Sequence, residues 1–129
     1  MLLLDTHVFL WTLEDDDRLT ATARSAISNN DCCISIITLW EMAVKASLAR
    51  EKRRLRLDRT IDEFADLCME YCIEILPITS EDCKQVMTLP HLHEDPFDRM
   101  LIAQAMTRAL PFVTRDENIW KYDGIETIW

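Results

Sequence analysis

Short, continuous apolar runs alternate along the chain with segments in which apolar residues recur at helical spacing. The runs lie at residues 2–4, 32–36, 73–76 and 112–114, with a further short run at 125–129. Helical patterns cover residues 6–14, 20–28, 39–49, 60–71, 81–87 and 96–109. Continuous rather than alternating apolar strands are typical of a parallel sheet that is covered on both faces. The pattern therefore predicts a three-layer α/β/α fold with a central parallel sheet.

The bulk composition fits one small packed domain. The chain has 129 residues, 49% of them hydrophobic, and no repeat or linker interrupts it, so we expect a single domain over residues 1–129. Every apolar run breaks within a few residues and a charge arrives already at Asp5, so neither a membrane span nor a signal peptide is predicted. The adjacent Cys32 and Cys33 lie in an apolar run, which suits buried thiols better than disulfides. These features predict a cytoplasmic protein.

Acidic residues follow the predicted strands. Asp5 comes directly after the strand at 2–4, Asp116 follows the strand at 112–114 by one residue, and Glu41 is predicted in the first turn of the helix after the strand at 32–36. Parallel sheets of this class bind their ligands beyond the carboxyl ends of the strands. Asp98, with Asp95 nearby, opens the helix that precedes the strand at 112–114. We expect these acids to converge.

Each acid, taken singly, also suits an ordinary structural role. Three of them fit the N-cap of a following helix or turn: Asp5, Asp95 and Asp116. Residues 38–41 fit a capping box, and Glu41 can instead pair with Lys45 one turn on. Asp98 suits the helix dipole as an acid in the first turn, but it also shares a helical stripe with apolar residues such as Ile102 and therefore faces the core side. A carboxylate there needs a cation or strong hydrogen bonds.

A divalent cation explains the acids jointly. Carboxylates gathered in one cleft raise one another's pKa, and a bound metal ion reverses that effect. Oxygen ligands without matched cysteine or histidine spacings suit Mg²⁺ or Mn²⁺. A zinc site would have to draw on Cys68, Cys72, His91 and His93, which lack the paired spacings of such sites. The sequence therefore favours a magnesium or manganese centre.

The charge of the chain is unevenly distributed. The net charge is −9, but residues 45–59 hold seven of the fourteen Lys and Arg against two acids, so this segment carries +5 and the rest −14. An acidic body with one basic stripe fits a metal site beside a track for phosphates. A solvated helix end and loop explains any single one of these basic residues equally well.

Several motifs together resemble the VapC-like branch of the PIN-domain family, in order and over nearly the whole chain. They are Leu4-Asp5-Thr6-His7 with Trp11, Ile36 with Trp40-Glu41, Asp95-Pro96-Phe97-Asp98-Arg99-Met100-Leu101-Ile102-Ala103-Gln104-Ala105, and Thr114-Arg115-Asp116. The third motif is long and specific, whereas an isolated Asp-Thr-His would carry little weight.

The resemblance implies a PIN fold and an endoribonuclease that depends on Mg²⁺ or Mn²⁺. It implies that Asp5, Glu41 and Asp98 form the core acidic site, with Asp116 as a less constant fourth member. It also implies the toxin component of a type II toxin–antitoxin system, usually homodimeric, which cleaves RNA and is held inactive by a cognate antitoxin protein. The roles of Asp95 and of Glu117, an extra acid beside Asp116, stay open.

Other polar and aromatic residues near the acids have less specific signals. His7 is expected to pack near the sheet rather than to contact phosphate, and His91 and His93 to lie in a polar loop. Arg99 and Arg115 flank the acids and suit surface ion pairs or phosphate binding. The tryptophans at helical positions are expected in the core rather than stacked on bases; they are Trp11, Trp40 and Trp120.

Three other functions are compatible with parts of the pattern. A phosphatase of the haloacid dehalogenase kind would also begin with an apolar strand and an aspartate, but it should carry a second aspartate where this chain has His7. A PIN-like domain that acts on DNA differs only in its substrate. A non-catalytic α/β domain that binds a partner protein predicts neither RNA cleavage nor stabilisation by a metal ion.

Overall fold

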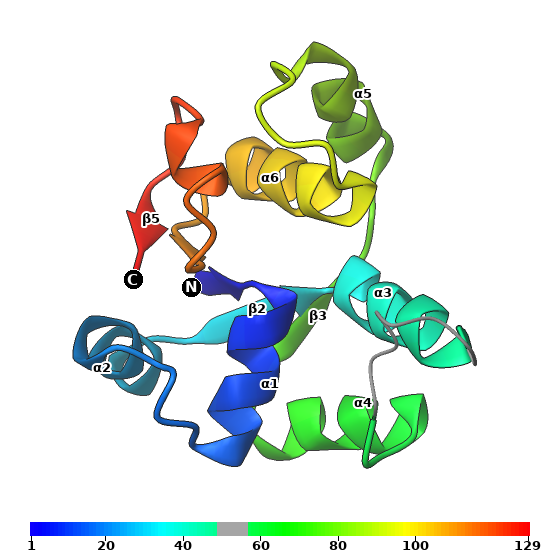
Figure 1. The fold of residues 1–129 in the computed structure, drawn as a ribbon, viewed down its shortest axis with the longest axis vertical. Helices are drawn as coiled ribbons and strands as arrows, with labels where there is room; N and C mark the ends of the chain where they lie inside the picture. Colours follow the sequence, from blue (N-terminus) through cyan, green and yellow to red (C-terminus); the bar gives the residue numbers. More distant parts are fainter. Residues whose placement is uncertain (49–56) are drawn as a thin grey trace.

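The computed structural model describes residues 1–48 and 57–129, which form five strands and six α-helices (Figure 1). In chain order the elements are β1 (Leu2–Leu4), α1 (Thr6–Glu14), α2 (Ala21–Asn29), β2 (Cys32–Ser35), α3 (Ile36–Ser47), α4 (Ile61–Glu70), β3 (Glu74–Leu76), α5 (Ser80–Thr88), α6 (Pro96–Arg108), β4 (Phe112–Val113), the 3-10 helix η1 (Ile119–Lys121) and β5 (Thr127–Ile128). The strands and helices predicted from the apolar pattern are all present in the described residues.

The five strands form one parallel sheet in the order β3-β2-β1-β4-β5, which confirms the predicted central parallel sheet. The chain starts in the middle strand, β1, moves outward to β2 and β3, and returns to β4 on the other side of β1. The direction of winding therefore reverses between β1 and β4. In open α/β sheets this reversal leaves a crevice beyond the carboxyl ends of the two strands.

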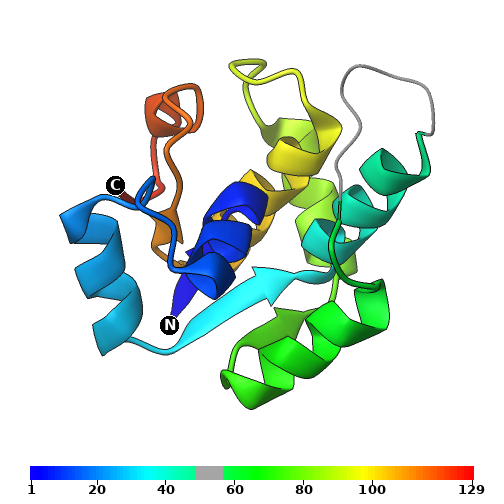
Figure 2. The ribbon, with the colours of Figure 1, turned by 60° about the horizontal axis from the view of Figure 1, so that its bottom comes forward.

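Helices cover both faces of the sheet, as Figures 1 and 2 show. On one face α1, α2 and α4 pack on Leu2, Leu4 and Ile34; on the other α5 and α6 pack on Leu3 and Phe112. Successive residues of β1 thus enter different cores, so the strand is apolar throughout. Helix α3 contacts both α4 and α6 and contributes to both cores.

Each of the six α-helices in the described residues is preceded by a capping residue. The side chain of this residue accepts a hydrogen bond from a backbone N–H of the first turn, which would otherwise lack a partner within the helix. The capping residues are Asp5, Thr20, Ser35, Thr60, Thr79 and Asp95. The caps predicted at Asp5 and Asp95 are therefore confirmed.

The junction of β2 and α3 differs from the prediction. Ser35 caps the helix, with its Oγ accepting from the Ile37 N–H at 3.0 Å, so α3 begins at Ile36 rather than near residue 39. The capping box predicted at residues 38–41 is consequently wrong, because Thr38 lies inside the helix. Glu41 sits in the second turn rather than the first, and the helix places it beside α6.

Two expectations concern parts of the chain away from the sheet. Within residues 1–48 and 57–129, no helix has the length and apolar character that crossing a membrane requires. Of the predicted basic stripe at 45–59, residues 49–56 lie outside the described part of the chain; they include Arg50, Lys52, Arg53, Arg54 and Arg56.

Candidate active site

A pocket of about 490 Å³ opens at the carboxyl ends of β1 and β4, where the winding of the sheet reverses. Its lining residues are Asp5, His7, Glu41, Lys45, Asp95, Asp98, Arg115, Asp116 and Glu117. All four acids expected to form the site line this pocket, together with the two acids whose roles the sequence left open. The pocket holds six carboxylates against one lysine and one arginine, so it is strongly acidic.

Asp5 is placed by β1 and held by the neighbouring strand. The register that pairs Leu4 with Val113 sets Asp5 beside Thr114, whose hydroxyl donates to Asp5 Oδ2 at 2.6 Å. The other oxygen accepts from the N–H of His7 at 3.4 Å as the cap of α1. Burial raises the pKa of Asp5 despite the hydrogen bond from Thr114. Asp5 therefore combines the capping role and the pocket role that the sequence had presented as alternatives.

Glu41 is buried and is oriented from two sides. The Thr6 hydroxyl donates to Glu41 Oε2 at 2.6 Å, and Lys45 forms an ion pair with Oε1 one turn along α3. The predicted pairing of Glu41 with Lys45 is thus confirmed. Burial lowers the pKa of Lys45, but the hydrogen bond and the charge of Glu41 outweigh burial and raise the pKa overall. Lys45 therefore remains charged at the edge of the pocket.

Asp98 is a strongly perturbed acid of the pocket. It lies in the first turn of α6, and its side chain is only 19% exposed. Burial, reinforced by the charges of Asp5, Asp95 and Glu41, raises the pKa of Asp98 to about 8. Asp95 serves mainly as the cap of the same helix, accepting from the Phe97 N–H at 2.8 Å. The charge cluster around Asp98 is what a cation in the pocket would relieve.

Asp116 follows β4 and is the most exposed of the four acids, at 33% of its side chain. Its Oδ1 accepts from the Asn118 N–H at 2.8 Å, which stabilises the turn into η1, while Oδ2 contacts the His93 ring. Thr114 also links this loop to β1, because its Oγ accepts from the Asp116 N–H at 3.1 Å and donates to Asp5. Glu117 is exposed and lines the pocket beside Asp116.

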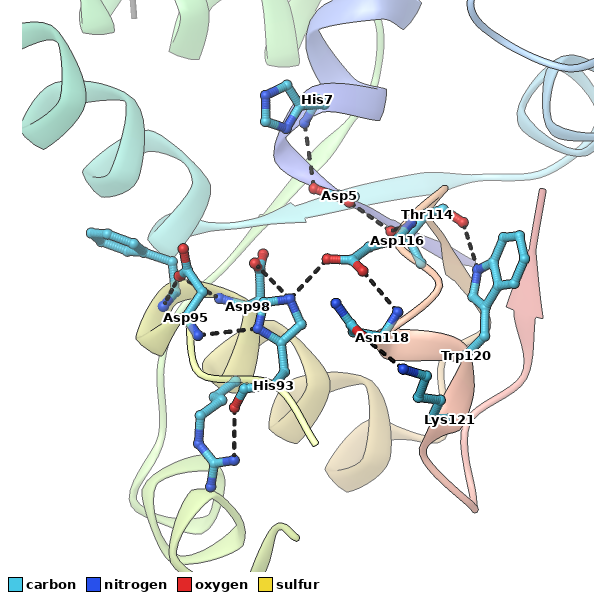
Figure 3. A network of polar contacts seen from close by, with 12 residues as sticks. Asp5, His7, His93, Asp95, Asp98, Thr114, Asp116, Asn118, Trp120 and Lys121 are labelled. Carbon is cyan, nitrogen blue, oxygen red and sulfur yellow. Dashed lines mark hydrogen bonds and ion pairs between the residues drawn. The ribbon is translucent and has the colours of Figure 1, made fainter. Parts of the chain in front are cut away.

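His93 is a site residue that sequence reasoning missed. It was expected in a polar loop, and it does lie between α5 and α6, but its ring projects between Asp98 and Asp116 (Figure 3). Its Nε2 lies 2.8 Å from Asp116 Oδ2 and 3.2 Å from Asp98 Oδ2. No periodicity marks a loop residue, so the sequence carried no signal for this contact.

The two arginines that flank the acids have different surroundings. Arg99 is tied to backbone carbonyls, among them Pro90 O at 3.0 Å and His93 O at 3.3 Å, and so holds the loop before α6. Arg115 lines the pocket with its guanidinium carbon 4.9 Å from the centre of the Trp11 ring, and among the described residues it has no acidic partner. Of these two arginines, Arg115 is the one that lines the pocket.

The expectations for aromatic residues and His7 were partly wrong. Trp11 is buried as expected, but Trp40 and Trp120 are 58% and 43% exposed. Trp40 meets Phe97 edge-on near the pocket, and Trp120 Nε1 donates to the carbonyl of Thr114 at 3.0 Å. His7 is exposed and lines the pocket instead of packing near the sheet.

The donors of the pocket fit a hard divalent cation. Each carboxylate offers about four lone-pair sites, and the described residues donate at most two hydrogen bonds to any of the four acids. Oxygen ligands with free lone pairs are what Mg²⁺ and Mn²⁺ require. Of the four residues named for a zinc site, His93 lies with Asp98 and Asp116 in a group that could hold a metal ion, and no cysteine belongs to that group. Cys68 is buried, and burial raises its pKa to about 11.

Comparisons with known proteins agree with this architecture. A protein from Mycobacterium tuberculosis, Ribonuclease VapC22, is 28% identical over 131 residues, covering 98% of this chain and 97% of that protein. The structure of VapBC2 from Rickettsia felis bound to a promoter DNA fragment superposes with a TM-score of 0.67 at 15% identity, covering 97% of this chain and 95% of that one. The structure of DNA-bound VapBC from Salmonella typhimurium superposes with a TM-score of 0.65 at 19% identity, covering 98% of this chain and 97% of that one.

The family is shown by a match that covers nearly the whole sequence. Residues 2–125 match the PIN domain family, a range that contains strands β1 to β4, all six α-helices and every residue that lines the pocket. The predicted family and the α/β/α fold are both confirmed. The chain belongs to the PIN domain family.

Proposed function

We propose that the protein is an endoribonuclease that depends on a divalent metal ion, Mg²⁺ or Mn²⁺. The observation that carries the proposal is the convergence of Asp5, Glu41, Asp98 and Asp116 on one pocket at the reversal of the sheet. Membership of the PIN domain family and the ribonuclease named among its relatives support the same activity. The substrate we assign is RNA.

The four acids would hold the cation through their carboxylate oxygens. When bound, a divalent cation offsets the charge of the phosphodiester and lowers the pKa of the attacking water. Thr114 and Thr6 hold Asp5 and Glu41 in fixed orientations through hydrogen bonds of 2.6 Å each. Because these hydroxyls are buried and their hydrogen bonds to the carboxylates are short, the two carboxylates need little rearrangement to act as ligands.

The surroundings of the acids favour a phosphate in the pocket. Arg115 presents a guanidinium with no acidic partner among the described residues, and guanidinium groups pair well with phosphate oxygens. Lys45 also lines the pocket and pairs with Glu41. We assign Arg115 to a phosphate of the RNA next to the one that is cleaved.

RNA cleavage by variants with and without metal tests the activity. Wild-type protein with Mg²⁺ or Mn²⁺ should cleave a panel of single-stranded RNAs, and EDTA should stop the reaction. Asp5→Asn should be inactive because it weakens metal binding, whereas Asp66→Asn, at an exposed acid on α4, should match the wild type. Cleavage that continues in EDTA, or equal cleavage by Asp5→Asn, would exclude the proposed mechanism.

We further propose that the protein is the toxin of a toxin–antitoxin pair and is controlled by a small cognate antitoxin. The similar structures from Rickettsia felis and Salmonella typhimurium are VapBC assemblies, and another neighbour is a VapBC toxin–antitoxin protein from Mycobacterium tuberculosis. The proposal predicts that a short protein encoded next to this one co-purifies with it and inhibits RNA cleavage. Full activity in the presence of that protein would contradict it.

We also propose that the protein forms a homodimer and acts in the cytoplasm. Ile36 and Trp40 lie one turn apart on α3 and are 41% and 58% exposed, which leaves apolar surface available to a second copy. Light scattering on the purified protein should give twice the monomer mass, and Trp40→Ser should lower it. A monomer over the micromolar range would remove this part of the proposal.

A further inference from the structure

His93 sits between two of the proposed metal ligands without a role in the proposed chemistry. Its side chain is 11% exposed, and its ring bridges Asp98 on α6 and Asp116 after β4 (Figure 3). We propose that His93 is a positioning residue: it donates its Nε2–H to both carboxylates, holds them for the cation, and does not itself bind the metal. This inference rests on the proposed function of the pocket.

The loop around His93 is held firmly. Its N–H donates to the Tyr122 hydroxyl at 3.0 Å, and its carbonyl accepts from Arg99 at 3.3 Å. Tyr122 in turn donates to the carbonyl of Pro90 at 2.9 Å. Both main-chain groups of His93 are therefore bonded to residues outside the pocket. A side chain on such an anchored backbone can fix the position of what it touches.

The hydrogen bonds of the ring identify its neutral tautomer. The N–H of Asp95 points at His93 Nδ1 at 3.1 Å. A backbone amide can only donate, so Nδ1 must offer its lone pair, and the ring proton of the neutral imidazole then lies on Nε2. Nε2 in turn faces oxygens of Asp98 and Asp116, which accept such a proton. Every contact of the ring agrees with one tautomer.

The same tautomer argues against metal ligation by His93. Nε2, Asp98 and Asp116 offer ligand atoms within 4.8 Å of one another, so proximity alone would suggest a three-ligand site. To bind a cation, however, Nε2 would have to present a lone pair, and Nδ1 would then carry a proton directed at the N–H of Asp95. That exchange would break the hydrogen bond of an amide at the start of α6. Oxygen ligands also suit Mg²⁺ better than imidazole does.

The proposed role explains how two separate elements supply a single site. Asp98 comes from α6 and Asp116 from the loop after β4, and the His93 proton ties the two together through their Oδ2 atoms. Among the described residues, Asp98 Oδ1 has no hydrogen-bond partner, which leaves it free for the cation. Groups that hydrogen-bond to metal ligands typically contribute about 10- to 100-fold to metal affinity.

Metal-binding calorimetry on full-length variants tests the proposal without relying on RNA cleavage. His93→Ala should bind Mg²⁺ about 10- to 100-fold more weakly than the wild type. His93→Gln should recover much of the affinity, because its amide can donate to the same carboxylates. His91→Ala is the matched control: His91 lies in the same loop, is exposed, and does not line the pocket, so its Mg²⁺ affinity should equal that of the wild type.

Metal preference separates positioning from ligation. If His93 only positions the acids, His93→Ala should weaken Mg²⁺ and Mn²⁺ binding by similar factors. A loss that is selective for Mn²⁺ would identify imidazole as a ligand and overturn the proposal. Unchanged Mg²⁺ affinity in His93→Ala would overturn it as well.

Nitrogen NMR of the wild-type imidazole provides a test that needs no substitution. We expect a protonated Nε2 and an unprotonated Nδ1 in EDTA, and the same tautomer in saturating Mg²⁺. A proton on Nδ1 in the metal-bound state would overturn the proposal. If these results hold but no RNA is cleaved, the positioning role stands and the proposed ribonuclease activity fails. If RNA is cleaved but metal binding does not depend on His93, the ribonuclease activity stands and the positioning role fails.

Discussion

Two aspartates, one beside the last turn of α6 and one in its first turn, are shielded from water in very different surroundings. Asp82 on α5 is 1% exposed and meets the last turn of α6, where Arg108 and Thr107 donate to Oδ1 at 2.9 and 2.6 Å. Burial would raise the pKa of Asp82, but the hydrogen bonds from Thr107, Thr79 and Arg108 outweigh it and hold the pKa below its usual range. The negative charge of Asp82 is therefore balanced and hydrogen-bonded by residues of the protein itself.

Asp98, at the first turn of α6, lacks such compensation. Within the described residues it contacts His93 but no lysine or arginine, and burial together with the neighbouring acids raises its pKa to about 8. Among the described residues, Asp82 therefore has its own cation and the largely buried Asp98 has none. The unbalanced charge around Asp98 is what the proposed metal ion would offset.

The largest effect expected from this comparison is on catalysis. Asp98→Asn should lower RNA cleavage more than about 100-fold, since even groups that only support a metal ligand contribute about 10- to 100-fold. Asp82→Asn should leave the rate per folded molecule within about twofold, because Asp82 lies outside the pocket. Initial rates on one RNA at saturating Mg²⁺ measure both. Similar rates for the two variants would remove the distinction between the sites.

The strand ends explain why much of the site could be predicted. Asp5 follows an apolar strand directly and Asp116 follows one closely, and the parallel sheet brings the ends of those strands together. Asp98 was recognisable because it shares a helical stripe with Ile102, which is fully buried. The spacing of apolar residues along a helix and the place of a residue after a strand are local properties, so both can be recognised in a single sequence.

Residues positioned by tertiary contacts could not be predicted in the same way. His93 reaches Asp116 across 23 residues of sequence, and nothing in its loop links the two. Trp40 was expected in the core, yet it is 58% exposed, on the same side of α3 as the exposed Ile36 four residues earlier. The start of α3 was missed because its cap, Ser35, lay within the apolar run that predicted the strand.

For stability measured in EDTA, we expect the reverse of the order for catalysis: the substitution at Asp82 should have the larger effect. Asp82→Asn should lower the free energy of unfolding by about 1.5–3 kcal/mol, the typical value of hydrogen bonds to a charged group. Asp98→Asn should be as stable as the wild type or more so, because an amide cannot take on the charge that burial and the neighbouring acids disfavour at this position. Urea unfolding in EDTA measures both values. A wild type clearly more stable than Asp98→Asn would mean that the chain itself stabilises the Asp98 charge.

The pH dependence of stability should also distinguish the two acids. The folded protein keeps the Asp98 proton up to about pH 8, whereas the unfolded chain releases it near the ordinary value of 3.8. The unfolded state then binds fewer protons in this window, so stability falls as the pH rises from about 4 to 8. Asp82, whose pKa is lowered, contributes in the opposite sense and loses its stabilisation as the pH falls.

Melting temperatures in EDTA of the wild type and of Asp98→Asn measure this difference. The wild type should lose stability relative to the variant between pH 4 and 8, and saturating Mg²⁺ should restore the wild type but not the variant. A constant difference between the two proteins across this range would show that Asp98 is already ionised without a metal ion.

The smallest effect concerns Arg115, the counterpart of Arg108 in this comparison. Arg108 is committed to Asp82, whereas Arg115 stacks near Trp11 and keeps its charge for a phosphate. In an Asp98→Asn background, Arg115→Gln should weaken RNA binding at low salt and reduce the slope of log K against log [salt] by about 0.7, the value for one contact to a single strand. Lys84→Gln, at an exposed cation on α5, should leave the slope unchanged. Equal slopes for all three proteins would place the RNA away from Arg115, while an equal reduction by Lys84→Gln would show that only net charge matters.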